Sequence, residues 1–105
     1  MQGKQFNSKR TRQFLASLTL LAKKENVNEV YSFLKEVFTL SEIEAMSDRL
    51  EIAYRLIDKQ RYRSIAQEMR VSTKTITQVA KRMKARKYGI KLAHQHYSEY
   101  RNNNK

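Results

Sequence analysis

The sequence predicts an all-α fold, and three observations lead to this prediction. Proline is absent and glycine occurs only at Gly3 and Gly89, so few positions interrupt a helix. Apolar residues recur three and four positions apart along most of the chain, which is the spacing of one helix face. The alternation of apolar and polar residues that is typical of strands is missing. We therefore expect one domain, residues 1–105, built from helices with short connections.

Two helices are expected at the start of the chain. The first runs from a cap at Ser8 to about Lys24, and the second from about Asn28 to Val37. The second is apolar around more than half of its circumference, so it needs cover on two sides. In a chain of this length, we expect another subunit to supply the second cover.

A third helix begins near Ser41 and continues to about Asp58, because Ser41 and Glu44 fit a capping box. Gly89 suits a left-handed helix C-cap, and a last helix covers about residues 90–101. Residues 1–7 and 102–105 are expected to be disordered tails.

Residues 62–83 are the stretch around which the rest of the chain is organised. They read YRSIAQEMRVSTKTITQVAKRM, which fits two short helices joined by a turn at Arg70 and Val71. Ser72 can cap the second helix with its hydroxyl. This is the pattern of a helix-turn-helix, whose second helix enters the DNA major groove. The apolar stripes of the two helices consist of Ile65, Met69, Ile76, Val79 and Met83.

Polar and cationic side chains remain for the outer surface of this element. Thr and Gln can hydrogen-bond base edges, and Lys can reach guanine or phosphate. The candidate base-reading residues are Thr73, Lys74, Thr77, Gln78 and Lys81. The candidate phosphate-contacting residues are Arg61, Arg63, Arg70, Ser72, Arg82, Lys84, Arg86 and Lys87.

The formal net charge of +12 is concentrated on the same stretch. Residues 13–60 contain six basic and eight acidic side chains, whereas residues 61–91 contain ten basic side chains and only Glu68 as an acid. The cations therefore coincide with the helix-turn-helix, where DNA phosphates would lie. The alternatives are a non-specific nucleoid- or RNA-associated binding protein, and a protein-interaction domain whose charge serves solubility.

Other functional classes find little support in the sequence. Cysteine is absent, which fits a reducing cytoplasm, and no apolar run approaches the ~20 residues that span a bilayer. We find no phosphate-binding glycine loop and no catalytic constellation, so no enzyme activity and no cofactor are expected. His94 and His96 point apart on a helix and are interpreted as surface residues, so no metal site is expected.

Two blocks of the sequence carry a resemblance to a known family. One is FTLSEIEAMSDRLEIAYRLI, residues 38–57, and the other is the helix-turn-helix block, residues 62–83. Together with their spacing they resemble the Trp-repressor family, and within it the TrpR-like branch called YerC/YecD-type. The likeness covers roughly residues 14–90. It implies an intertwined homodimer that presents two DNA-reading helix-turn-helix units (reader heads, residues 62–83 of each subunit) to a pseudo-palindromic operator.

The resemblance implies a bacterial, cytoplasmic, nucleoid-associated transcriptional regulator, with repression as the favoured mode. Thr39 and Arg49 match family residues that hold the corepressor, so they would belong to a vestigial effector pocket. On the reader head, the family's Arg, Gly and Ser are replaced by Gln78, Val79 and Arg82. Gln78 lacks the charge to pair with a carboxylate, and Val79 occupies the place of the indole.

We therefore expect that tryptophan does not bind and that any small-molecule effector is unknown. Arg49 is then interpreted as a structural ion-pairing residue, with Glu51 or the neighbourhood of Asp48 as its partner.

Overall fold

The computed structural model describes residues 8–86 and 88–104, and over these residues it contains six α-helices and no strand. This confirms the predicted all-α class. The chain divides into two compact units, Met1–Ile43 and Glu44–Lys105. The organisation as a single functional domain stays a prediction.

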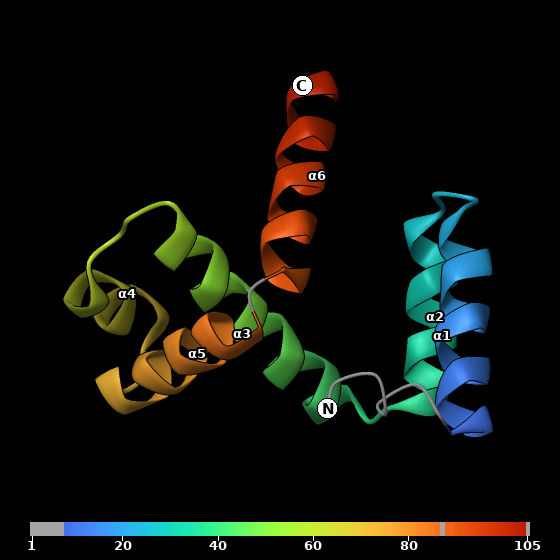
Figure 1. Cartoon of the computed structure of the whole chain (residues 1–105), viewed down its shortest axis with the longest axis horizontal. Helices are drawn as coiled ribbons and strands as arrows, with labels where there is room; N and C mark the ends of the chain where they lie inside the picture. The colour runs from blue at the N-terminus through green and yellow to red at the C-terminus, as the bar shows by residue number, and fades with distance from the viewer. Residues whose placement is uncertain (1–7, 87, 105) are drawn as a thin grey trace. The chain divides into compact units, whose positions relative to one another are not determined.

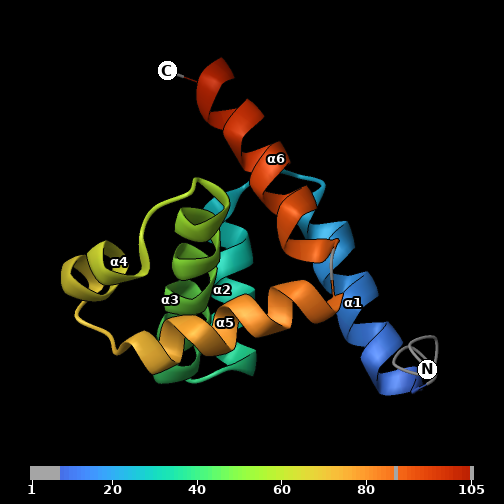
Figure 2. The ribbon, with the colours of Figure 1, turned by 60° about the vertical axis from the view of Figure 1, so that its left-hand side comes forward.

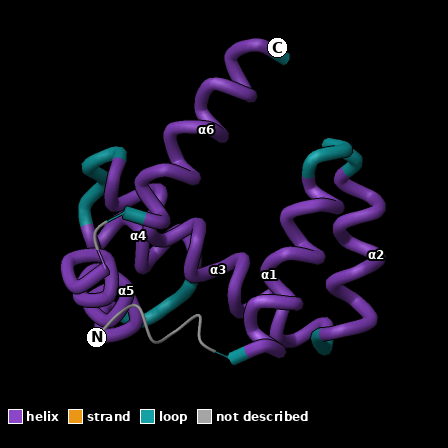
Figure 3. The backbone as a smooth tube through the Cα atoms, turned by 45° about the vertical axis from the view of Figure 1, so that its right-hand side comes forward, coloured by secondary structure: helices purple, strands orange, loops and turns teal. Residues whose placement is uncertain are grey.

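The first unit contains two helices, α1 (Lys9–Ala22) and α2 (Val27–Val37), which lie side by side (Figures 1 and 3). Ser8 caps α1 as predicted, since its hydroxyl accepts a hydrogen bond from the amide of Thr11 at 3.3 Å. Asn26 caps α2 in the same way through the amide of Glu29, at 3.2 Å.

Aromatic contacts hold the two helices together. The ring of Phe14 on α1 stacks on Phe33 of α2, with the ring centroids 6.1 Å apart, and meets Phe38 edge-on at 5.9 Å. Nevertheless, no residue of either helix is fully buried in the single chain. The described residues of the first unit, 8–43, therefore form no closed core of their own.

The third helix, α3 (Leu40–Ile57), begins with a capping box that differs from the predicted one. The Thr39 hydroxyl accepts from the Glu42 amide at 3.1 Å, and the Thr39 amide donates to the Glu42 carboxylate at 2.8 Å. The prediction of Ser41 and Glu44 as the box was wrong by two residues. Both pairs have the same spacing, and the structure uses the earlier one.

The second unit contains α3 from Glu44 onward, α4 (Tyr62–Met69), α5 (Thr73–Arg86) and α6 (Gly89–Asn103). Figure 2 shows α5 crossing α3, with α4 beside the N-terminal end of α5. Side chains from α3, α4 and α5 meet in one hydrophobic core. Its buried members are Ile52, Ala53, Ile65, Ile76 and Val79.

The C-terminal region departs from the prediction at two places. Gly89 has no positive φ and is the first residue of α6, so the predicted left-handed C-cap was wrong. The helix continues to Asn103, and Asn104 follows as its C-cap, so residues 102–104 do not form the tail that we expected. Residues 1–7 and Lys105, also predicted as tails, lie outside the described residues.

Candidate nucleic-acid interface

The turn between α4 and α5 is built by a left-handed residue. Arg70 adopts φ 58° and ψ 45°, which reverses the chain after Met69. The amide of Val71 then donates to the carbonyl of Ala66 at 3.1 Å, as in a Schellman motif. Val71 itself packs against the core. The predicted turn at these two residues is confirmed.

Ser72 caps α5 as predicted. Its hydroxyl accepts a hydrogen bond from the amide of Thr75 at 3.1 Å and lies 3.0 Å from the Thr75 hydroxyl. The cap therefore fixes the first turn of the helix that would face DNA. This hydroxyl therefore has partners within the protein, and its predicted role as a phosphate contact stays a prediction.

The inner faces of α4 and α5 pack as the sequence predicted. Ile65 and Ile76 are completely buried and Val79 is 6% exposed. Met69 and Met83 are partly buried and pack against the same core. Since these side chains fix the rotation of both helices about their axes, they also determine which residues face outward.

The candidate base-reading residues lie on the outer face of α5. Thr77 also donates its hydroxyl to the carbonyl of Thr73 at 2.9 Å, which directs its side chain along the helix. Lys74, Gln78 and Lys81 follow one another at helical spacing, so they share one face. All five are exposed: Thr73, Lys74, Thr77, Gln78 and Lys81.

The candidate phosphate-contacting cations lie on or next to α4 and α5. None of them forms an ion pair within the part of the chain that the structure describes. Their charge is therefore available to an external anion. The exposed cations are Arg61, Arg63, Arg70, Arg82, Lys84 and Arg86. Lys87, which belongs to the predicted set, lies outside the described residues.

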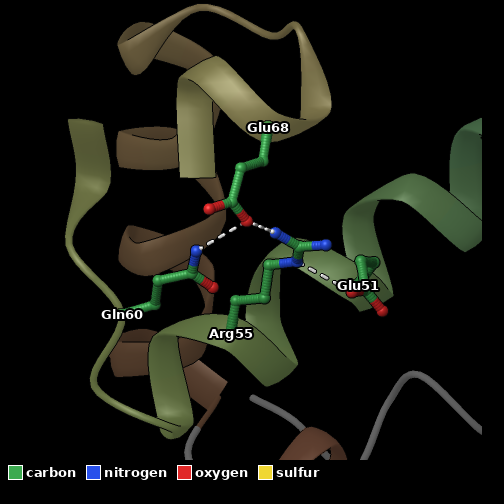
Figure 4. A network of polar contacts seen from close by, with 4 residues as sticks. All are labelled: Glu51, Arg55, Gln60 and Glu68. Carbon is green, nitrogen blue, oxygen red and sulfur yellow. Dashed lines mark hydrogen bonds and ion pairs between the residues drawn. The ribbon is translucent and has the colours of Figure 1, made fainter. Parts of the chain in front are cut away.

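A polar network holds the carboxylate of Glu68, the one acid among residues 61–91 (Figure 4). The Glu68 carboxylate of α4 accepts from the Gln60 amide at 3.0 Å and from the Arg55 guanidinium of α3 at 2.6 Å. Arg55 also donates to Glu51 at 2.8 Å. The hydrogen bond from Gln60, followed by that from Arg55, lowers the pKa of Glu68. The network ties α4 to α3 and gives Glu68 a cationic partner, although Arg55 is shared between the two carboxylates of Glu51 and Glu68.

This network corrects the interpretation of Arg49. Glu51 pairs with Arg55 instead, and Arg49 forms no ion pair among the described residues. The spacing of Glu51 and Arg55, four residues apart on a helix, is a signal that could have identified this pair. The link to Glu68 is not readable from such local spacing.

Arg49 instead lines a cavity between α3, α5 and the start of α6, with a volume of about 200 Å³. Val79 and Arg82 line the same cavity, so the structure brings together three of the residues that the resemblance associated with an effector pocket. Thr39 belongs to the other unit, where its side chain caps α3.

His94 differs from the surface histidine that the sequence suggested. Its side chain is 20% exposed and its Nε2 lies 3.0 Å from the Asp58 carboxylate. The ring also meets Tyr54 edge-on, at 4.9 Å between centroids. His94 therefore fixes α6 against α3. No group of three potential metal ligands occurs among residues 8–86 and 88–104.

Comparison with known proteins bears on this interface. No helix within the described residues has the length and apolar character needed to cross a membrane. Neither a curated protein nor a solved structure matches the chain. The family described as Trp repressor protein matches residues 12–96, which include the helix-turn-helix and parts of both units. Because this match covers most of the sequence, the chain belongs to the Trp repressor protein family.

Proposed function

We propose that this protein is a transcriptional regulator that binds double-stranded DNA sequence-specifically through α4 and α5. The main support for the proposal is the outer face of α5, where Thr, Gln and Lys side chains are exposed. The exposed arginines and lysines of α4, the turn and α5 form no ion pair within the described residues. Membership of the Trp repressor protein family also suggests a DNA-binding regulator.

The proposed binding form is a homodimer on a pseudo-palindromic operator. Two reader heads related by a two-fold axis would enter successive major grooves about 34 Å apart. We further propose that the protein acts as a repressor in the bacterial cytoplasm, in association with the nucleoid. Its assignment to the YerC/YecD-type branch belongs to the same proposal.

Selection from a randomised duplex library, followed by sequencing of the retained DNA, tests this function. A two-fold symmetric motif with half-sites one helical turn apart is the expected result. Retention without any motif would instead favour a nucleoid- or RNA-associated binding protein. No retention would favour a protein-interaction domain.

Two substitutions test the division of labour between base reading and phosphate contact. Gln78→Ala is expected to relax specificity at one base pair by ~1–3 kcal/mol, because it removes a base-edge hydrogen bond. Lys84→Ala should weaken binding to all duplexes alike. It should also reduce the steepness of the plot of log binding constant against log salt concentration by about one unit. Anisotropy titrations with the selected site and a scrambled duplex measure both effects. Equal losses on the two duplexes for both variants would contradict the assignment.

We also propose that L-tryptophan is not the effector. Val79 lines the cavity that contains Arg49 and places a branched side chain where the resemblance puts the indole. Gln78, the preceding residue on α5, has no charge to pair with a carboxylate. Isothermal titration with L-tryptophan should give no heat of binding. Saturable binding at micromolar concentration would refute this proposal.

A further inference from the structure

A second groove in the Glu44–Lys105 unit lies where residues of α3, α4, α5 and α6 meet. Its volume is about 530 Å³, within the ~300–1,000 Å³ range of small-molecule sites. It shares no lining residue with the smaller cavity that contains Arg49. It is therefore distinct from the effector pocket that the family resemblance implied.

The floor of this groove is apolar. Leu56 and Ile57 of α3 and Met83 of α5 line it. All three are half-buried, and Leu56 and Met83 also pack against the core of the unit. The floor is thus held in place by the packing of the unit, and it offers apolar surface that a ligand could remove from water.

The rim of the groove is cationic. Lys59, Lys84 and Lys91 line it together, and none of its lining residues is acidic. Within the described residues none of the three lysines forms an ion pair. Three ammonium groups around one groove repel one another, and a bound anion would relieve that repulsion.

The position of Lys59 is fixed by the end of α3. Lys59 has φ 69°, and its amide donates to the carbonyl of Leu56 at 3.0 Å. The amide of Gln60 donates to the carbonyl of Arg55, also at 3.0 Å. These bonds form a Schellman motif that satisfies carbonyls at the end of the helix. The amide hydrogens therefore partly neutralise the negative ends of these carbonyl dipoles beside the groove.

We propose that this groove binds a small amphipathic anion, with an alkyl chain on the apolar floor and a carboxylate or phosphate head among Lys59, Lys84 and Lys91. The apolar floor would bury the alkyl chain, and the three lysines would pair with the anionic head. A ligand without the chain loses the first contribution, and a ligand without the head loses the second.

Isotope-labelled methionine and isoleucine methyl groups provide a site-specific test by nuclear magnetic resonance. Met83 lines this groove and also a cavity of about 220 Å³ between α5 and α6, whereas Ile57 lines this groove and neither of the other two cavities. Met46 and Ile90 line the cavity that contains Arg49, and Ile90 also lines the cavity between α5 and α6. Dodecyl phosphate and dodecanoate, each below its micelle-forming concentration, should shift the Ile57 and Met83 signals saturably and leave Met46 and Ile90 unchanged. Comparing their affinities distinguishes the phosphate head from the carboxylate head. Dodecanol and inorganic phosphate should bind at least about tenfold more weakly.

A matched pair of double variants tests the role of the lysines. Lys59→Gln with Lys91→Gln should raise the Kd for dodecyl phosphate about tenfold or more, since charge-assisted contacts are lost. Lys9→Gln with Lys23→Gln removes the same charge from exposed positions in the other unit and should leave the Kd unchanged. Equal losses in the two double variants would overturn the proposal. So would a shift of Met46 or Ile90 in place of Ile57, equal binding of dodecanol, or no saturable shift.

Occupation of the groove has a consequence that rests on the proposed function. Lys84 lines the groove and is also a proposed phosphate contact, so a bound anion should compete with DNA for its charge. Dodecyl phosphate is then expected to raise the Kd for the selected operator, with a smaller effect in the Lys59→Gln, Lys91→Gln variant. Ligand binding is measured without DNA. Failure of the site and failure of the DNA-binding function are therefore distinguishable.

Discussion

Arg70 has two roles in the structure, one of them conformational and the other electrostatic. Its backbone is left-handed, with φ 58°, a region that costs residues with a Cβ roughly 1–2 kcal/mol. Its guanidinium is exposed and has no ion-pair partner within the described chain. Two substitutions that remove the same charge can separate these roles.

Arg70→Gly is expected to be more stable than Arg70→Ala by about 1 kcal/mol, because glycine adopts the left-handed turn without the steric cost. Urea unfolding at equal chain concentration measures the difference. Both variants should lose the same DNA affinity, since both lose one phosphate contact. Equal stability, or a more stable alanine variant, would show that the left-handed turn carries no such cost.

The capping of α3 shows why one local prediction failed at the scale of single residues. Thr39 with Glu42 and Ser41 with Glu44 both have the spacing of a capping box. The sequence pattern does not distinguish the two pairs. Which pair caps α3 depends on the residue at which α2 ends, and α2 ends at Val37, two residues before Thr39. A hydroxyl residue with an acidic residue three positions later therefore predicts a helix start only to within a few positions.

At the scale of elements, the network of Arg55, Gln60 and Glu68 fastens α4 to α3. The Glu68 pKa is lowered by the hydrogen bond from Gln60 and by Arg55. Its contribution to stability is therefore complete above the ordinary pKa of 4.5, and it decreases as the pH falls through the lowered value.

Glu68→Gln should accordingly be less stable than the wild type at neutral pH, and the difference should shrink below pH 4.5. Urea midpoints measured as a function of pH check this expectation. Glu36→Gln is the matched control, because Glu36 is exposed and forms no ion pair among the described residues. A difference between wild type and Glu68→Gln that is independent of pH would exclude this electrostatic role.

The elements differ in how far the sequence could predict them. The burial of Ile65, Ile76 and Val79 followed from helical periodicity, because that signal is local. The pairs Arg55–Glu68 and His94–Asp58 are 13 and 36 residues apart, so they depend on how whole helices pack. Gly89 was placed at the wrong helix end because its freedom at positive φ is an option that the structure does not use.

At the scale of the whole molecule, the apolar surface of α2 supports the proposed homodimer. Val27 is 73% exposed, Tyr31 42% and Val37 53% in the single chain. Isolated exposed apolar residues are common, but a set along one helix is typical of an interaction surface. The sequence predicted this need for cover on two sides, and a second copy of the chain is the proposed partner.

Tyr31→Glu is expected to raise the dimer dissociation constant about tenfold or more, because it places a charge in a surface that would be apolar and buried. The new carboxylate has Lys35 four residues away, which supports the helix in the monomer. Ser32→Glu adds the same charge at the next, exposed polar position and serves as the control. Sedimentation equilibrium measures the dimer dissociation constants of the wild type and of the two variants. A monomeric wild type, or equal effects of the two substitutions, would contradict the proposed dimer surface.

The central claim is that buried side chains of α4 and α5 hold a cationic, polar surface in the form that fits a DNA groove. A titration of the purified chain with labelled duplex DNA at increasing salt tests it most directly. The six exposed candidate phosphate contacts form no ion pair within the described residues. With one phosphate contact from each, the affinity should fall by at least about a thousandfold between about 50 and 200 mM salt. A chain that binds no duplex of any sequence at the lowest salt concentration would contradict the claim.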